Sequence, residues 1–284
     1  TMGVGSGYTQ RDVQELARVL TGVGVNLSKD TPRLRPEFQR AYVRKGLFEF
    51  NPQRHDFGDK QILGKTIHGR GLSEIEEVLS LLSREPATAR FISHKLAVYF
   101  VSDTPSPALV ENMAQQFLHT DGDIPSVLRT MFEAPEFVAS LGSKFKDPVH
   151  YVVSSVRLAY DGVTLMNTAP MLNWLNTMGE QPNGRQTPDG YSMMESAWAS
   201  PGQMTTRFDI AKAMASGSAG LFKAENQETN VRPQDVPRPS LANSDYVKNW
   251  LKSFSVSTQQ ALKQAGTPQE WNAFFLATPE MMRR

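Results

Sequence analysis

Residues 147–160, DPVHYVVSSVRLAY, decide the fold. Aspartate is a preferred helix-capping residue, and proline suits the first helical position because its nitrogen carries no hydrogen and its φ is already helical. Apolar side chains follow at the spacing of a single helix face: Val149, Val152, Val153, Val156 and Tyr160. The stretch therefore predicts an amphipathic helix that begins at Pro148.

The same start signal recurs along the chain. A capping side chain precedes proline at Ser106-Pro107, Thr267-Pro268 and Thr278-Pro279, and Thr9 with Asp12 resembles a capping box. Apolar stripes at helical spacing lie behind several starts, including Val13, Leu16, Ala17 and Leu20, and Ile75, Val78, Leu79 and Leu82 behind Ser73. We therefore expect a predominantly all-α fold, in which 1–284 form a single multi-helix domain.

Segments rich in glycine and proline interrupt this pattern at residues 22–71, 179–202 and 223–240, which we expect to be irregular. Within the first segment, residues 41–43 and 47–50 are rich in β-branched and aromatic side chains on either side of Arg44-Lys45-Gly46. This arrangement predicts one short β-hairpin. Long irregular segments in compact domains are frequently functional, which directs the search for a site to them.

Composition excludes several classes of protein. The 284 residues include 30 Lys and Arg against 29 Asp and Glu, a formal net charge of +1. Nucleic-acid binding rewards a large basic excess, so this balance argues against nucleic acid as a partner. No apolar run reaches the roughly 20 residues of a membrane span. The sequence contains no cysteine, which excludes disulfides, thiolate metal sites and a cysteine nucleophile.

The densest polar cluster is His55-Asp56-Phe57-Gly58-Asp59-Lys60, in the first irregular segment. An imidazole, a carboxylate and an ammonium so close together suit proton transfer, which makes His55, Asp56 and Lys60 the candidate catalytic residues. His55 and Asp56 are also candidate ligands of a divalent metal, although the further ligands would come from elsewhere. The alternative is structural: Asp56 and Lys60 tie the loop together, and the glycines supply its turns.

We expect a particular geometry for the loop at residues 55–64. His55 and Asp56 should be ordered and at least partly buried, and Lys60 or Lys95 should lie close enough to pair with a carboxylate, because an unpaired buried charge is costly. If the loop is functional, the turn at residues 187–191 should form the other wall of a cleft. His150 is a weaker candidate: the first turn of a helix disfavours positive charge, so a neutral imidazole there suits a base, a metal ligand or a structural role.

Blocks of residues along the whole chain resemble one bacterial family. Gly7-Tyr8-Thr9-Gln10, the His55–Lys60 run with Ile62-Leu63-Gly64, and Lys144-Phe145-Lys146-Asp147-Pro148 are similar to the blocks of the domain-of-unknown-function 1800 family. Pro188-Asp189-Gly190-Tyr191 and the final Ala277-Thr278-Pro279-Glu280-Met281-Met282-Arg283-Arg284 fit its later blocks.

The resemblance implies a setting but no reaction. It implies that the chain corresponds to the C-terminal part of a longer protein, that the protein is exported to the periplasm or beyond, and that a sulfatase-like protein encoded nearby is a partner. The favoured hypothesis is an exported helical scaffold or interaction protein. The alternative is a hydrolase or metal-dependent enzyme that acts on an extracellular polymer through the His55-Asp56 loop.

Overall fold

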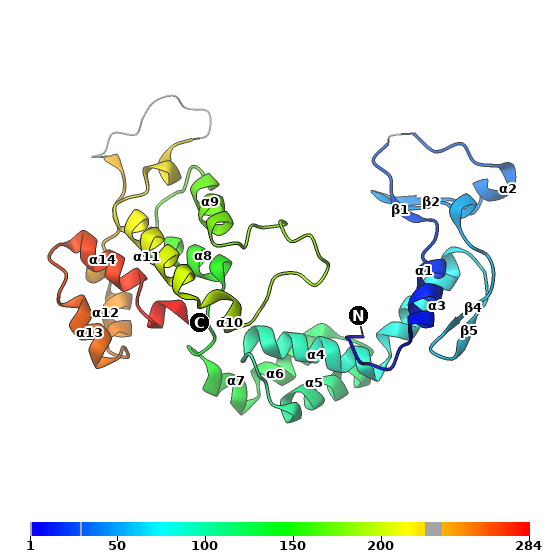
Figure 1. Ribbon diagram of the computed structural model, residues 1–284, viewed down its shortest axis with the longest axis horizontal. Coiled ribbons are helices and arrows are strands. Elements are labelled where there is room, and N and C mark those ends of the chain that lie inside the picture. Colours follow the sequence, from blue (N-terminus) through cyan, green and yellow to red (C-terminus); the bar gives the residue numbers. More distant parts are fainter. Residues whose placement is uncertain (1, 29, 225–234) are drawn as a thin grey trace. The chain divides into compact units, whose positions relative to one another are not determined.

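The computed structural model describes residues 2–28, 30–224 and 235–284 and is mostly helical, as the sequence predicts (Figure 1). The chain forms two compact units, Thr1–Ala97 with Ser106–Ala134, and Val98–Pro105 with Pro135–Arg284. A single-domain organisation stays a prediction. Part of the expected irregular segment 223–240 lies outside the described residues.

The first unit combines helices with short strands. Its elements are α1 (Gln10–Val19), β1 (Val23–Val25), α2 (Pro36–Gln39), β2 (Val43–Lys45), β3 (Phe48–Phe50), the 3-10 helix η1 (Pro52–Arg54), β4 (Lys60–Ile62), β5 (Lys65–Ile67), α3 (Leu72–Ser83), most of α4 (Pro86–Phe100), α5 (Pro107–His119) and α6 (Ile124–Phe132). Beneath α1, α3 and the strands lies a core of Val19, Phe50, Ile62, Ile67, Ile75 and Val78.

The second unit is helical. Its elements after the end of α4 are α7 (Pro135–Ser140), α8 (Pro148–Ala159), α9 (Ala169–Thr177), α10 (Glu195–Trp198), α11 (Pro201–Ala215), η2 (Ala219–Phe222), η4 (Leu241–Asn243), α12 (Asp245–Leu251), α13 (Val256–Leu262), α14 (Pro268–Leu276) and η5 (Glu280–Met282). Helices α11 and α14 lie side by side, and α8 contacts α11 and α9 (Figure 1). The buried face of α8 includes Tyr151, Val152 and Val156.

The predicted helix starts are confirmed where the capping side chain and the backbone N–H that donates to it lie within one turn. The side chains of Ser106, Asp147 and Thr267 each accept a backbone N–H three residues ahead, at the starts of α5, α8 and α14. Thr9 and Asp12 form the complete capping box of α1. These contacts satisfy N–H groups that have no partner inside the helix, which explains why the local sequence suffices to place them.

Two predicted helix starts are wrong in detail. Helix α3 begins at Leu72 rather than at Ser73, since Gly71 occupies the cap position with a φ of 70° and no side-chain bond. Thr278 does accept the N–H of Met281, at 3.2 Å, but the residues that follow form only the 3-10 helix η5. The third member of the α3 stripe, Leu79, is 56% exposed instead of buried.

Segment 22–71 contains more regular structure than the sequence predicts. The expected hairpin is present as β2 and β3, with Val43 opposite Phe50, but Arg44 and Lys45 belong to β2 and only Gly46 and Leu47 connect the strands. Strand β1 pairs with the other side of β3. Strands β4 and β5 form a second antiparallel hairpin that we did not expect. Its turn holds Leu63 and Gly64 at φ 48° and 77°, the positive values of a type I′ turn. Leucine rarely adopts such a φ, so the sequence does not predict this turn.

Candidate functional site

The His55 imidazole is buried beneath the first unit's strands. Its side chain has no exposed surface, and Nδ1 lies 2.7 Å from the backbone oxygen of Thr21. A carbonyl oxygen only accepts, so Nδ1 carries the proton and donates it. The other nitrogen, Nε2, lies 3.2 Å from Glu74 Oε1, in a direction that makes no hydrogen bond. The imidazole therefore has one fixed donor and one nitrogen facing a carboxylate.

Lys60 shares that carboxylate. Its ammonium donates to Glu74 Oε1 and to the backbone oxygen of Asp56, and neither the Lys60 nor the Glu74 side chain has exposed surface. The other Glu74 oxygen, Oε2, accepts the backbone N–H of Arg70 at 2.7 Å. We refer to His55, Lys60 and Glu74 as the His55 cluster. The expected pairing of Lys60 with a buried carboxylate is confirmed, and the carboxylate is Glu74.

Asp56 points to a different partner. Arg18 Nε donates to Asp56 Oδ2 at 2.8 Å, and the N–H of Gly58 donates to Oδ1 at 2.8 Å. The Arg18 hydrogen bond is the main reason that the pKa of Asp56 falls to about 2. The Asp56 side chain is 38% exposed, so it is partly buried as expected. Lys95, the other lysine considered, lies over the ring of Phe91 at 5.3 Å from the centroid.

The structure thus brings His55 and Lys60 together but directs the Asp56 carboxylate to Arg18. Among the described residues, no three His, Asp or Glu side chains converge where a metal ion could bind. The turn at residues 187–191 belongs to the second unit. The catalytic roles of His55, Asp56 and Lys60, the metal role of His55 and Asp56, and the cleft with that turn stay predictions.

A second group of polar side chains surrounds the N-terminus of α8 in the second unit. The His150 Nδ1–H donates to the capping carboxylate of Asp147, at 2.7 Å from Oδ2. Nε2 then accepts, from Arg284 Nη1 at 2.5 Å and with the Tyr99 hydroxyl at 3.1 Å. Both ring nitrogens therefore already have partners, Asp147 at Nδ1 and Arg284 with Tyr99 at Nε2. Its lone pair already faces a guanidinium, so the geometry favours the structural role over the base.

Glu180 adds a second carboxyl group at this helix end. Its Oε2 accepts the backbone N–H of Val149 at 2.9 Å, and the residue is only 8% exposed. Burial raises the pKa of Glu180 to about 7, and the nearby charge of Asp147 adds to the rise. Near neutral pH this carboxyl group is therefore only partly ionised.

Two cations of this region, Lys146 and Arg207, form no hydrogen bond or ion pair with a carboxylate among the described residues, although the charges of Asp147 and Glu180 act on Arg207. Arg207 is fully buried, donates from Nη2 to the backbone oxygen of Lys146 at 2.8 Å, and lies 4.9 and 4.8 Å from the ring centroids of Phe145 and Tyr151. Burial lowers the pKa of Arg207 to about 10. Lys146 is 6% exposed, and its ammonium has no hydrogen-bond or ion-pair partner in the part of the chain that the structure describes.

Sequence reasoning missed Lys146 and Arg207 as notable residues. Lys146 stands in the Lys144–Pro148 block, but nothing in its neighbourhood distinguishes it from the paired Lys144. Arg207 lies within α11 and carries no motif at all. Only packing shows that both cations are buried without a carboxylate.

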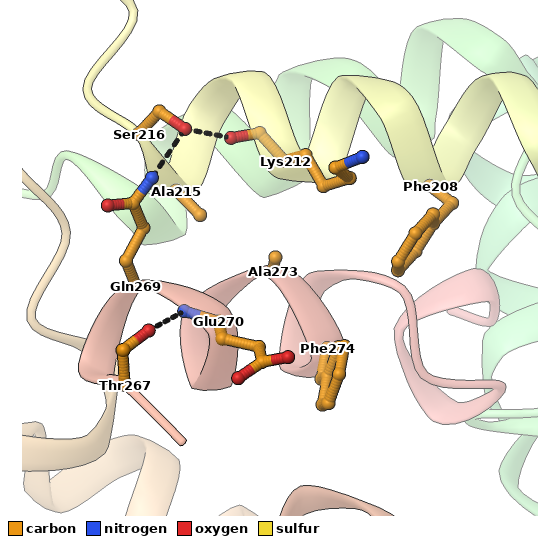
Figure 2. Close-up of a pocket in the computed structure, with 9 residues that line it drawn as sticks. All are labelled: Phe208, Lys212, Ala215, Ser216, Thr267, Gln269, Glu270, Ala273 and Phe274. Carbon is orange, nitrogen blue, oxygen red and sulfur yellow. Dashed lines mark hydrogen bonds between the residues drawn. The ribbon is translucent and has the colours of Figure 1, made fainter. Parts of the chain in front are cut away.

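A groove of about 520 Å³ separates α11 from α14 (Figure 2). Its polar groups already bind one another, because Gln269 donates to Ser216 at 2.7 Å and the Ser216 hydroxyl donates to the backbone oxygen of Lys212 at 2.8 Å. Phe208 and Phe274 face each other across it with ring centroids 6.4 Å apart. We interpret this groove as a packing seam between the helices.

The family model described as "Protein of unknown function (DUF1800)" matches residues 1–283. No curated protein and no solved structure matches the chain. Among the described residues no helix is long and apolar enough to cross a membrane.

Proposed function

We propose, from the chain's membership of the family of unknown function DUF1800, that it is an exported helical scaffold whose first unit binds a partner protein. The observation that carries the proposal is an apolar surface on the strands of that unit. We call it the β1–β3 patch and define it by the exposed side chains of Val23, Val25, Leu27 and Phe48.

Register explains why these side chains gather. Val25 lies directly opposite Phe48, and residues opposite each other in an antiparallel pair point to the same face of the sheet. Leu27 follows Val25 by two residues and therefore points to the same face, whereas Leu47 lies opposite Asn26, whose backbone N–H donates to the Leu47 oxygen at 2.9 Å, and points to the other face. Leu27 is 82% exposed and Val25 is 70% exposed. Contiguous exposed apolar surface is typical of a protein-binding face.

The closed His55 cluster supports a scaffold over the alternative. A hydrolase or metal-dependent enzyme that used this loop would need substrate to reach His55 and Lys60, but neither side chain is exposed. The Lys60 ammonium already donates to Glu74 and to the backbone oxygen of Asp56, and His55 Nδ1 already donates to the backbone oxygen of Thr21. The loop therefore has the features of a structural junction between η1, β4 and α3.

The family resemblance supplies the class of partner, a sulfatase-like protein, and the setting, the periplasm or the extracellular space. The direct test is a binding measurement between this chain and a sulfatase-like protein encoded nearby. We expect Val25→Asp to weaken binding by at least about tenfold, because an ionised carboxylate would have to be desolvated at the interface.

The matched control is Val256→Asp. Val256 is 71% exposed, almost the same as Val25, but it lies at the start of α13 in the second unit. We expect this variant to bind normally. Equal binding by both variants would contradict the proposal. A metal present at one equivalent in the wild-type protein and lost in His55→Ala would instead favour the enzyme.

A further inference from the structure

The second unit contains a pocket of about 340 Å³ beside α8 and α12. This volume is at the lower end of the range for small-molecule sites. Lys146 enters its wall from the segment before α8, Ser154 and Arg157 from α8, and Tyr246 and Trp250 from α12. Both hydrogen-bonding and aromatic groups therefore line the same space.

Lys146 is the feature that makes this pocket unlike the groove of Figure 2. Its side chain is almost completely buried, it lines the pocket, and none of the described residues gives its ammonium a partner. Burial lowers the pKa of Lys146 to about 8, and the charges of Arg207 and Arg284 lower it further in the same direction. The Lys146 side chain is largely buried and its ammonium has no carboxylate partner among the described residues, so an anion bound in the pocket would stabilise it.

We propose that this pocket binds an acidic sugar, with the sugar's carboxylate on Lys146 and Arg157 and its ring against Tyr246 and Trp250. Arg157 is exposed on α8 and provides the second cation. The aromatic pair is positioned by packing: Tyr246 and Trp250 have ring centroids 6.0 Å apart, and Trp250 contacts Phe254 edge-on at 5.1 Å. Aromatic faces of this kind offer flat apolar area to the C–H face of a pyranose ring.

Two oxygen-bearing side chains favour a sugar over a simple organic acid. Asp161 and Ser154 line the same pocket as the cations. The Ser154 hydroxyl donates to the backbone oxygen of Tyr151 at 3.3 Å, so its own oxygen stays available to accept. Hydroxyl groups on the ligand would donate to these oxygens. A ligand that is anionic over its whole surface would instead be repelled by Asp161.

The test is a titration of the full chain with methyl glucuronide, in which binding is measured by calorimetry or by changes in amide chemical shifts. Methyl glucoside, which lacks the carboxylate, and benzoate, which lacks the hydroxyls, are the comparison ligands. We expect saturable binding of the glucuronide, and binding of either comparison ligand weaker by about tenfold or more.

Lys146→Met keeps the length of the side chain and removes its charge. We expect about 10- to 100-fold weaker glucuronide binding, the range for a lost hydrogen bond to a charged group, with the thermal unfolding temperature unchanged or raised. Tyr246→Ala gives a second variant, and because Tyr246 is 65% exposed the fold should tolerate it. It should also weaken binding.

The matched control is Lys144→Met. Lys144 is equally buried, but its ammonium pairs with Asp103 and donates to the backbone oxygen of Met193 at 2.8 Å. We expect this variant to be less stable and, where folded, to bind the glucuronide normally. Absence of saturable binding by the wild type, or equal affinities of the wild type and Lys146→Met, would overturn the proposal. Benzoate or methyl glucoside binding as tightly as the glucuronide would overturn the assignment to an acidic sugar.

Discussion

The two units each bury charged side chains, but they balance them differently. In the first unit, the Lys60 ammonium and the His55 imidazole converge on the carboxylate of Glu74, and no exposed surface remains on any of the three side chains. In the second unit, Lys146 and Arg207 are buried with no carboxylate bonded to either cation among the described residues. The balanced charges of the first unit form a closed junction, whereas the unpartnered Lys146 of the second unit lines the pocket in which we propose that an anion binds.

The physical reason for the difference is the cost of desolvation. Each buried ion loses several kcal/mol of hydration, and only a well-placed opposite charge restores it. Glu74 supplies that charge to Lys60. In the second unit Arg207 is stabilised instead by the faces of Phe145 and Tyr151, and Lys146 loses part of its charge as its pKa falls to about 8.

The largest expected effect comes from breaking the balanced cluster. Lys60→Met leaves Glu74 buried without its ammonium, and we expect a loss of about 3–5 kcal/mol in the free energy of unfolding. Urea unfolding at neutral pH measures it. Lys65→Met is the control, because Lys65 is exposed on β5 and should change the free energy by less than about 0.5 kcal/mol. Similar losses of unfolding free energy in the two variants would mean that the Lys60–Glu74 ion pair does not stabilise the His55 cluster.

The next test compares the two buried lysines of one segment. Lys144→Met removes the partner of Asp103, whose side chain is 27% exposed, and should cost about 1–3 kcal/mol. Lys146→Met removes an unpartnered charge and should cost less than about 0.5 kcal/mol or stabilise the protein. Thermal and urea unfolding of both variants give the comparison. A larger loss for Lys146→Met would show that this ammonium has a structural partner.

Glu180 should make stability depend on pH in the mildly acidic range. Its pKa is about 7 in the folded protein and 4.5 without the fold, so the folded state binds more protons between these values. The free energy of unfolding should therefore fall as pH rises from about 4.5 to 7, by about 2–3 kcal/mol at most. Glu180→Gln should abolish this decline, because it can still accept from Val149. A decline that persists in the variant would assign it to another group.

The smallest effect is expected at Asp56, which is half exposed and paired with Arg18. Its folded pKa of about 2 lies below the ordinary 3.8, so the pair stabilises the protein above about pH 4, and that contribution is lost as pH falls toward 2. Because solvent screens the pair, we expect no more than about 1 kcal/mol. Acid unfolding of Asp56→Asn should show a correspondingly smaller loss between pH 4 and 2 than wild type.

The sequence by itself determined the helical class and the starts of α1, α5, α8 and α14. Thr9, Ser106, Asp147 and Thr267 bond to backbone N–H groups three residues ahead, so all the information lies within one turn. The hairpin of β2 and β3 was predictable for the same reason. The β4–β5 hairpin was not, because its turn needs Leu63 at a positive φ that leucine rarely adopts.

Only the tertiary structure decided which side chains meet. The sequence prediction placed His55, Asp56 and Lys60 in one candidate site. In the structure Asp56 pairs with Arg18, 38 residues away, and Lys60 pairs with Glu74, 14 residues away. The wall of the pocket at Lys146 combines residues of α8 and α12, which the sequence separates by about 90 residues. Capping is a contact between near neighbours and is fixed by local chemistry. The partner of a buried charge is fixed by packing, which joins residues that the sequence keeps far apart.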